Sequence, residues 1–117
     1  MISYKGRRSK GRRAELEAKK LLEAAGWTVE IVHGAQKYNA NVDMFGLWDL
    51  LALKGGWRKF IQVKCNRKPP FKEYEGFARQ FGNPFCSFEV WVRKDNKPKE
   101  KRWSTWIMRG CNQEFKE

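Results

Sequence analysis

The sequence predicts a mixed α/β domain in which helices pack on a central sheet. Two segments have the composition of helices and are each followed by a glycine stop, 14–25 and 71–81. Five other segments are rich in β-branched and aromatic residues, as strands are: 27–33, 47–53, 58–64, 85–93 and 101–108. The chain has 117 residues, the usual size of one domain, and contains neither an internal repeat nor a linker.

The first expected helix covers residues 14–25, AELEAKKLLEAA, in which Ala, Leu, Glu and Lys are all strong helix formers. Gly26 is a natural stop for it. Its apolar side chains share one face at helical spacing: Ala14, Ala18, Leu21, Leu22 and Ala25. We expect this face to pack on the sheet.

Three strands are expected next. Residues 27–33, WTVEIVH, alternate and are β-branched, which is typical of a strand. Residues 34–46 are polar and form a loop, and ordered loops of this length are often functional. The strands over about 47–53 and 58–64 are joined by Lys54-Gly55-Gly56-Trp57, and a Gly-Gly turn between two apolar runs predicts a hairpin.

The second helix, 71–81, follows a break at the sequence NRKPP and ends at Gly82-Asn83-Pro84. The last two strands, 85–93 and 101–108, enclose a basic segment that we interpret as the tip of a β-hairpin. The predicted order is therefore helix, three strands, helix and two strands.

The composition favours a partner with many negative charges. The formal net charge is +12, from 25 Lys and Arg against 13 Asp and Glu. On one small domain this charge favours nucleic acid, with a role in solubility alone as the alternative. No apolar run approaches the ~18 residues of a membrane span, and no apolar signal segment begins the chain. We therefore expect a cytoplasmic protein without a membrane partner, with Cys65, Cys86 and Cys111 as reduced thiols.

The basic residues are clustered in two segments. Residues 1–13 contain six Lys and Arg and no acid, and we expect a flexible arm there that becomes ordered on phosphates, followed by one domain over 14–117. Residues 93–102 contain six more against two acids. Each segment alone is compatible with a merely solvated surface, but together they indicate a binding surface. The candidate contacts to nucleic acid are Lys5, Arg7, Arg8, Lys10, Arg12, Arg13, Lys97, Lys99 and Lys101.

Polar side chains on the predicted hairpin form a candidate catalytic site. Side chains alternate along a strand, so Gln62 and Lys64 point to one face and Val63 to the other. Pairing through the Gly55-Gly56 turn places a residue near Asp49 opposite one near Gln62. A carboxylate, an amide oxygen and the main-chain carbonyl of Val63 are oxygen ligands suited to Mg²⁺. The ammonium of Lys64 is suited to orienting or deprotonating an attacking water, or to stabilising the phosphate, which is the chemistry of phosphodiester hydrolysis.

A structural role is the alternative for all three side chains. Asp49 is also suited to capping a loop, and Gln62 and Lys64 to the solvent side of a half-buried hairpin. Spacing alone leaves both interpretations open.

The pattern Asp, a short gap, then Glu/Gln-x-Lys resembles the PD-(D/E)xK nuclease superfamily. The element order also resembles its restriction-endonuclease-like fold, an αβββαβ core, here with an extra C-terminal strand. The segment KGRRAELEAKKLLEAAG, with Lys10-Gly11 four residues before Glu15 and with Ala25-Gly26 at its end, resembles the archaeal-type and phage Holliday junction resolvases. The motif resemblance covers roughly residues 9–66.

The resemblance implies a role for each matching residue. Glu15 would be a helix acid that helps to hold the metal or its water, Asp49 the central ligand, Gln62 the second acidic position and Lys64 the motif lysine. It implies a Mg²⁺-dependent endonuclease, with Mn²⁺ as a substitute, that acts on branched DNA in an archaeal, bacterial or phage-infected cell and works as a homodimer. Helical geometry alone does not choose between Glu15 and Glu17, which lie on opposite edges of the apolar face.

One departure matters for this resemblance. Gln62 stands where the superfamily usually has Glu, and a neutral amide binds Mg²⁺ less strongly than a carboxylate. A nickase or flap endonuclease of the same fold, a DNA-binding protein that has lost its chemistry at Gln62, and a basic interaction module without nuclease ancestry are therefore alternatives. His33 is interpreted as a surface residue, with a contact to the metal site or a phosphate as the alternative, and Asp43 as a turn residue, with a further carboxylate ligand as the alternative. Trp57, Trp91, Trp103 and Trp106 are interpreted as core or dimer residues, with base stacking as the alternative.

Overall fold

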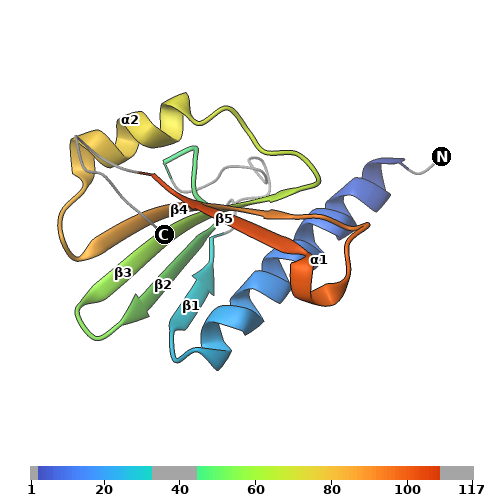
Figure 1. Cartoon of the computed structure of the whole chain (residues 1–117), viewed down its shortest axis with the longest axis horizontal. Helices are drawn as coiled ribbons and strands as arrows, with labels where there is room; N and C mark the ends of the chain where they lie inside the picture. Colours follow the sequence, from blue (N-terminus) through green and yellow to red (C-terminus); the bar gives the residue numbers. More distant parts are fainter. Residues whose placement is uncertain (1–2, 33–44, 109–117) are drawn as a thin grey trace.

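The structure, a computed structural model, describes residues 3–32 and 45–108, with side chains from Gly11 onward in the first range. The elements of these ranges are drawn in Figure 1. In chain order they are α1 (Ser3–Ala24), β1 (Thr28–Ile31), β2 (Leu50–Lys54), β3 (Trp57–Cys65), α2 (Lys72–Phe81), β4 (Cys86–Arg93), the short 3₁₀ helix η1 (Lys99–Lys101) and β5 (Trp103–Ile107).

The described strands form one five-stranded sheet in the order β1-β2-β3-β4-β5. β1, β2 and β3 are antiparallel, β4 runs parallel to β3, and β5 returns antiparallel to β4. A parallel pair requires a crossover, and α2 provides it between β3 and β4. The predicted element order and the mixed α/β class are confirmed.

The two helices cover opposite faces of this sheet (Figure 1). α1 packs against β1, β2 and β3 through Ala14, Ala18 and Leu22, which are all buried. The two alanines carry no side chain beyond Cβ, so the helix approaches the sheet closely. The expectation that Leu21 and Ala25 share this packed face is wrong, since both are exposed. The sheet residues under α1 are Val29, Leu50, Ala52, Ile61, Val63 and Trp91.

α2 covers the other face with an aromatic cluster centred on Trp48. The Trp48 ring is fully buried and lies 5.3 Å from Tyr74, 5.7 Å from Phe77 and 5.5 Å from Phe88, measured between ring centroids. Aromatic pairs at this separation stabilise a core beyond the area that they bury. The cluster also contains Ala78, Val90, Val92 and Met108.

The predicted start of the first helix is wrong. The helix begins at Ser3 rather than Ala14, and therefore includes most of the segment that we expected to be a flexible arm. Lys and Arg are strong helix formers, and a single glycine such as Gly11 costs only about 1 kcal/mol relative to alanine, so the basic segment can continue the helix. How residues 1–13 behave on DNA stays a prediction. His33, Asp43 and Cys111 lie outside the described residues.

Candidate functional site

Asp49 immediately precedes β2 and lies between the end of β1 and β3. Its main-chain N–H donates to the carbonyl of Ile61 at 2.8 Å, and its carbonyl accepts from the N–H of Val32 at 2.7 Å. Its carboxylate Oδ2 accepts a hydrogen bond from the main-chain N–H of Val63 at 2.9 Å. The residue is only 6% exposed, so both its main chain and its carboxylate are fixed by β-strand neighbours.

The chain is irregular at Asp49, in the manner of a β-bulge. Leu50 is the residue that pairs with Ile61, yet the N–H of Asp49 also bonds to Ile61, so two residues of one strand face one residue of the next. Side chains consequently stop alternating here: Leu50 packs under α1, whereas Trp48 packs under α2 instead of returning to the α1 side. Bulges re-aim side chains and are frequent beside active sites.

Gln62 points to the face of β3 that α2 covers. Its Nε2 donates to the hydroxyl of Tyr74 at 3.1 Å, and the residue is 4% exposed. Its neighbours Ile61 and Val63 pack on the α1 side, which agrees with the predicted alternation. Lys64 is half-buried and lies opposite Val92 of β4. The structure thus brings Asp49 into contact with Val63, between the two polar positions of β3.

Glu15 and Glu17 occupy different edges of α1. Glu15 is half-buried beside Ala14 and Ala18, which pack on the sheet. Glu17 faces β4 and β5 instead: its Oε1 accepts from Arg93 Nε at 2.8 Å and its Oε2 from Trp103 Nε1 at 2.9 Å. Both oxygens of Glu17 therefore have structural partners, so Glu17 joins α1 to β4 and β5.

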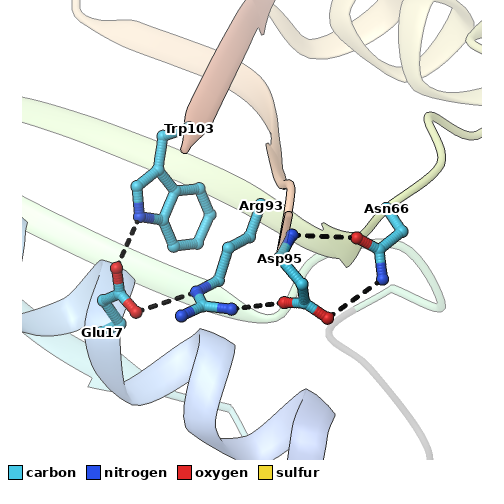
Figure 2. A network of polar contacts seen from close by, with 5 residues as sticks. All are labelled: Glu17, Asn66, Arg93, Asp95 and Trp103. Atoms are coloured by element: carbon cyan, nitrogen blue, oxygen red, sulfur yellow. Dashed lines mark hydrogen bonds and ion pairs between the residues drawn. The ribbon is translucent and has the colours of Figure 1, made fainter. Parts of the chain in front are cut away.

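The contacts of Glu17 belong to a polar network that joins α1 to the ends of β3 and β4 (Figure 2). Arg93 bonds both to Glu17 and, through Nη1, to Asp95. Asp95 accepts from Asn66 Nδ2 at 3.2 Å, and its N–H donates to Asn66 Oδ1 at 3.0 Å. Asn66 follows Lys64 by two residues and has a left-handed backbone, φ 67°, which asparagine tolerates. The network therefore fixes the chain just beyond Lys64.

This network also changes the pKa of Glu17. Burial by itself raises that pKa, but the hydrogen bonds from Trp103 and Arg93 and the charges of Arg93 and Arg102 outweigh burial. The net result is a pKa below its ordinary value of 4.5, so Glu17 is a carboxylate at neutral pH.

The predicted basic contacts lie on two elements. Arg12 and Arg13 are exposed on α1, and Lys97, Lys99 and Lys101 are exposed in the segment that joins β4 to β5 and contains η1. The side chains of Lys5, Arg7, Arg8 and Lys10 lie outside the described part of the structure. None of the helices described is both long enough and apolar enough to cross a membrane.

The oxygen donors near Asp49 are chemically suited to a hard divalent cation. No three His, Cys, Asp or Glu side chains group as metal ligands within the described residues. A site here would therefore combine carboxylate, amide and main-chain oxygens, a set that Mg²⁺ accepts with water in its remaining positions. The amide nitrogen Nε2 of Gln62 makes the hydrogen bond to Tyr74. The amide oxygen Oε1 takes no part in that bond, so Gln62 fits such a site.

Several residues of the site region were not predicted from the sequence. Tyr74 lies in the predicted helix 71–81, but its hydrogen bond with Gln62 was not predicted. A tyrosine among apolar helix positions is a signal for such a buried hydrogen bond. Of the four tryptophans interpreted as core or dimer residues, Trp91, Trp103 and Trp106 do pack in the two clusters. For Trp57 a place in the core is wrong, since it is 52% exposed at the start of β3.

Comparison with known proteins agrees with the fold and the motif resemblance. No protein-family model matches the chain, and no curated protein matches it. Among solved structures, the chain is similar to Hjc of Archaeoglobus fulgidus, a Holliday junction resolvase from an archaeal hyperthermophile. The two share 25% sequence identity with a TM-score of 0.58, over 84% of this chain and 77% of the resolvase. This similarity supports the interpretation of the chain as a nuclease of this fold. The five-stranded mixed sheet with a helix on each face is the restriction-endonuclease-like fold, and the chain resembles an archaeal Holliday junction resolvase in both sequence motif and structure.

Proposed function

We propose that this chain is a divalent-metal-dependent DNA endonuclease that hydrolyses phosphodiester bonds in branched DNA, as a Holliday junction resolvase does. The observation that carries the proposal is the buried carboxylate of Asp49, held against the main chain of Val63 between Gln62 and Lys64. The similarity to the Archaeoglobus fulgidus resolvase supports the same conclusion.

Asp49, the amide oxygen of Gln62 and the carbonyl of Val63 would hold Mg²⁺ or Mn²⁺. Glu15 lies on α1, which covers the face of the sheet opposite to Gln62, so a role in holding the metal or its water would require it to reach around the edge of the sheet. A cation held by these residues would supply Lewis-acid polarisation of a phosphate and would lower the pKa of a bound water. The protein's own contribution is to hold these oxygens rigidly, through the bulge at Asp49 and the bond from Gln62 to Tyr74. Lys64 then places an ammonium beside the phosphate, where it stabilises negative charge or orients the attacking water.

The charge of the protein supports DNA as the substrate. Each Lys or Arg that contacts a phosphate releases counterions, so binding falls steeply with salt. Arg12 and Arg13 on α1 and the three lysines of the β4–β5 connection supply exposed cations on separate elements. Resolution of a junction requires two cuts in symmetric strands, which a homodimer with two identical sites provides.

Cleavage of labelled DNA tests the proposal. A four-way junction, a duplex and a single strand are incubated with the wild type in Mg²⁺ and in EDTA. We expect the junction to be cut in Mg²⁺ and not in EDTA, and Asp49→Asn to lower the rate at least a hundredfold. Glu75→Gln, which neutralises an exposed carboxylate on α2, is the matched control and should cut normally. Equal cleavage by wild type and Asp49→Asn would contradict the mechanism.

One observation favours a second candidate function. Gln62 is buried against Tyr74 instead of supplying a carboxylate, which is compatible with a DNA-binding protein that no longer cleaves. That function predicts salt-sensitive binding of the same junction without cleavage in Mg²⁺ or Mn²⁺. Preferential cutting of a nicked or flapped duplex over the four-way junction would instead indicate a nickase or flap endonuclease of this fold.

A further inference from the structure

A pocket of about 400 Å³ lies at the other end of β3 from Gln62 and Lys64, and it plays no part in the proposed chemistry. Its lining residues combine aromatic and basic side chains: Trp27, Lys54, Trp57, Arg58, Lys59 and Ser87. It lies just past the C-terminal end of α1, since Lys54 donates to the carbonyl of Ala25 at 2.8 Å. Its volume falls within the range of small-ligand sites.

The charges around the pocket leave it cationic. Lys59 is neutralised by Glu89, whose Oε2 is 2.8 Å from its ammonium. Glu89 is only 3% exposed and also accepts hydrogen bonds from Ser87 and Trp91, so it is committed to this structural role. Lys54 bonds to a neutral carbonyl. Arg58 precedes Lys59 on β3, so strand alternation turns its side chain to the face of Phe60 and Gln62, away from Lys59. The ammonium of Lys54 therefore remains for an anionic ligand.

Two tryptophan rings line the pocket: that of Trp27 already contacts lysine ammonium groups, and that of Trp57 is exposed. The ammonium groups of Lys54 and Lys59 lie 5.6 Å and 5.1 Å from the centroid of Trp27, within cation–π distance. Trp57 is instead 52% exposed, and its ring lies 5.4 Å from that of Phe85, which is 54% exposed. A large exposed indole supported by a second ring is a suitable surface for a planar aromatic ligand.

We propose that this pocket binds one unpaired nucleotide, with its base stacked on Trp57 and its phosphate bound by Lys54. The chemistry is that of proteins that bind single-stranded nucleic acid, in which aromatic side chains stack on bases and cations contact the backbone.

Binding of a short fluorescein-labelled oligothymidylate to the full chain in EDTA tests the proposal. EDTA prevents metal-dependent cleavage, so the result does not depend on whether the chain is a nuclease. We expect Trp57→Ala and Lys54→Ala each to raise the Kd about tenfold. Phe81→Ala is the control for the tryptophan, because Phe81 is 53% exposed on α2, and Lys72→Ala, also exposed on α2, is the control for the lysine. Both controls should bind as the wild type does.

Two further comparisons separate base stacking from charge and from misfolding. An abasic oligonucleotide of the same length should bind the wild type as weakly as oligothymidylate binds Trp57→Ala. Trp57→Phe, which keeps an aromatic face, should retain most of the affinity. Competition by thymidine monophosphate would support the pocket as a site for free nucleotide, and absence of competition with oligonucleotide binding intact would support it as a site for a DNA strand. Unchanged binding by Trp57→Ala, or equal binding of the abasic strand, would overturn the proposal.

Discussion

The side-chain amide of Gln62 donates a hydrogen bond to the hydroxyl of Tyr74, 3.1 Å away, and so joins β3 to α2 inside the protein. Gln62 is thus part of a buried contact between two elements. Its substitution should therefore affect both stability and metal binding.

Gln62→Glu is expected to make the protein dependent on a divalent cation for full stability. A carboxylate buried at this position loses hydration, which should lower the free energy of unfolding by about 1–3 kcal/mol in EDTA. Mg²⁺ binds the folded state of this variant preferentially and should restore part of that loss. Urea unfolding in EDTA and in Mg²⁺ measures both effects. Tyr74→Phe is the control, since it removes the hydrogen bond between Gln62 and Tyr74 without adding charge. A loss of stability in Gln62→Glu that Mg²⁺ does not reduce would contradict this prediction.

The contact between Asp49 and Val63 predicts different effects of two substitutions. Asp49→Ala leaves the buried N–H of Val63 without its acceptor and should cost about 1–3 kcal/mol of stability. Asp49→Asn keeps an oxygen acceptor of the same shape and should cost less. Urea midpoints of the two variants measure this difference at neutral pH. Equal destabilisation by both would mean that this hydrogen bond contributes little to folding.

The lowered pKa of Glu17 predicts a specific dependence of stability on pH. A carboxyl whose pKa is lowered by folding stabilises the protein above its unfolded pKa, near 4.5, and loses this contribution as the pH falls through the lower folded value. Glu17→Gln should therefore be less stable than wild type at neutral pH, and the difference should shrink as the pH falls below 4.5 and through the lower folded value. Urea unfolding across this range measures it, with Glu75→Gln as the control. A difference that stays constant with pH would contradict the assignment to the Glu17 carboxylate.

The lysines between β4 and β5 should contribute to DNA affinity through phosphates. Replacing Lys97, Lys99 and Lys101 together with alanine should weaken junction binding and reduce the slope of log K against log salt by about one for each phosphate that a lysine no longer neutralises. Lys72→Ala, an exposed lysine of α2, serves as a single-charge control and should change the slope little. An unchanged slope in the triple variant would show that DNA binds elsewhere.

The sequence was sufficient to predict the order of the elements and the orientation of Gln62. Helix composition, the Gly55-Gly56 turn and β-strand alternation are local properties, and each was confirmed by the observed elements. The alternation of β3 alone indicated that Gln62 and Val63 point to opposite faces.

The features that could not be predicted depend on contacts between distant segments. The bulge at Asp49 is defined by hydrogen bonds to Val32, Ile61 and Val63, none of which is local in sequence. The role of Glu17 depends on Arg93 and Trp103, more than 70 residues away along the chain. Helical periodicity placed Glu15 and Glu17 on opposite edges of α1 but could not show which edge meets β4 and β5.

The proposed chemistry requires a divalent cation that binds where Asp49 meets Val63, and amide NMR with added Mn²⁺ tests this most directly. Paramagnetic Mn²⁺ broadens the resonances of nearby amides, so its position can be mapped on the labelled protein. We predict that the amides of Asp49, Val63 and Lys64 broaden first in the wild type and remain sharp at the same Mn²⁺ concentration in Asp49→Asn. Broadening centred elsewhere, or the same broadening in both proteins, would contradict the account.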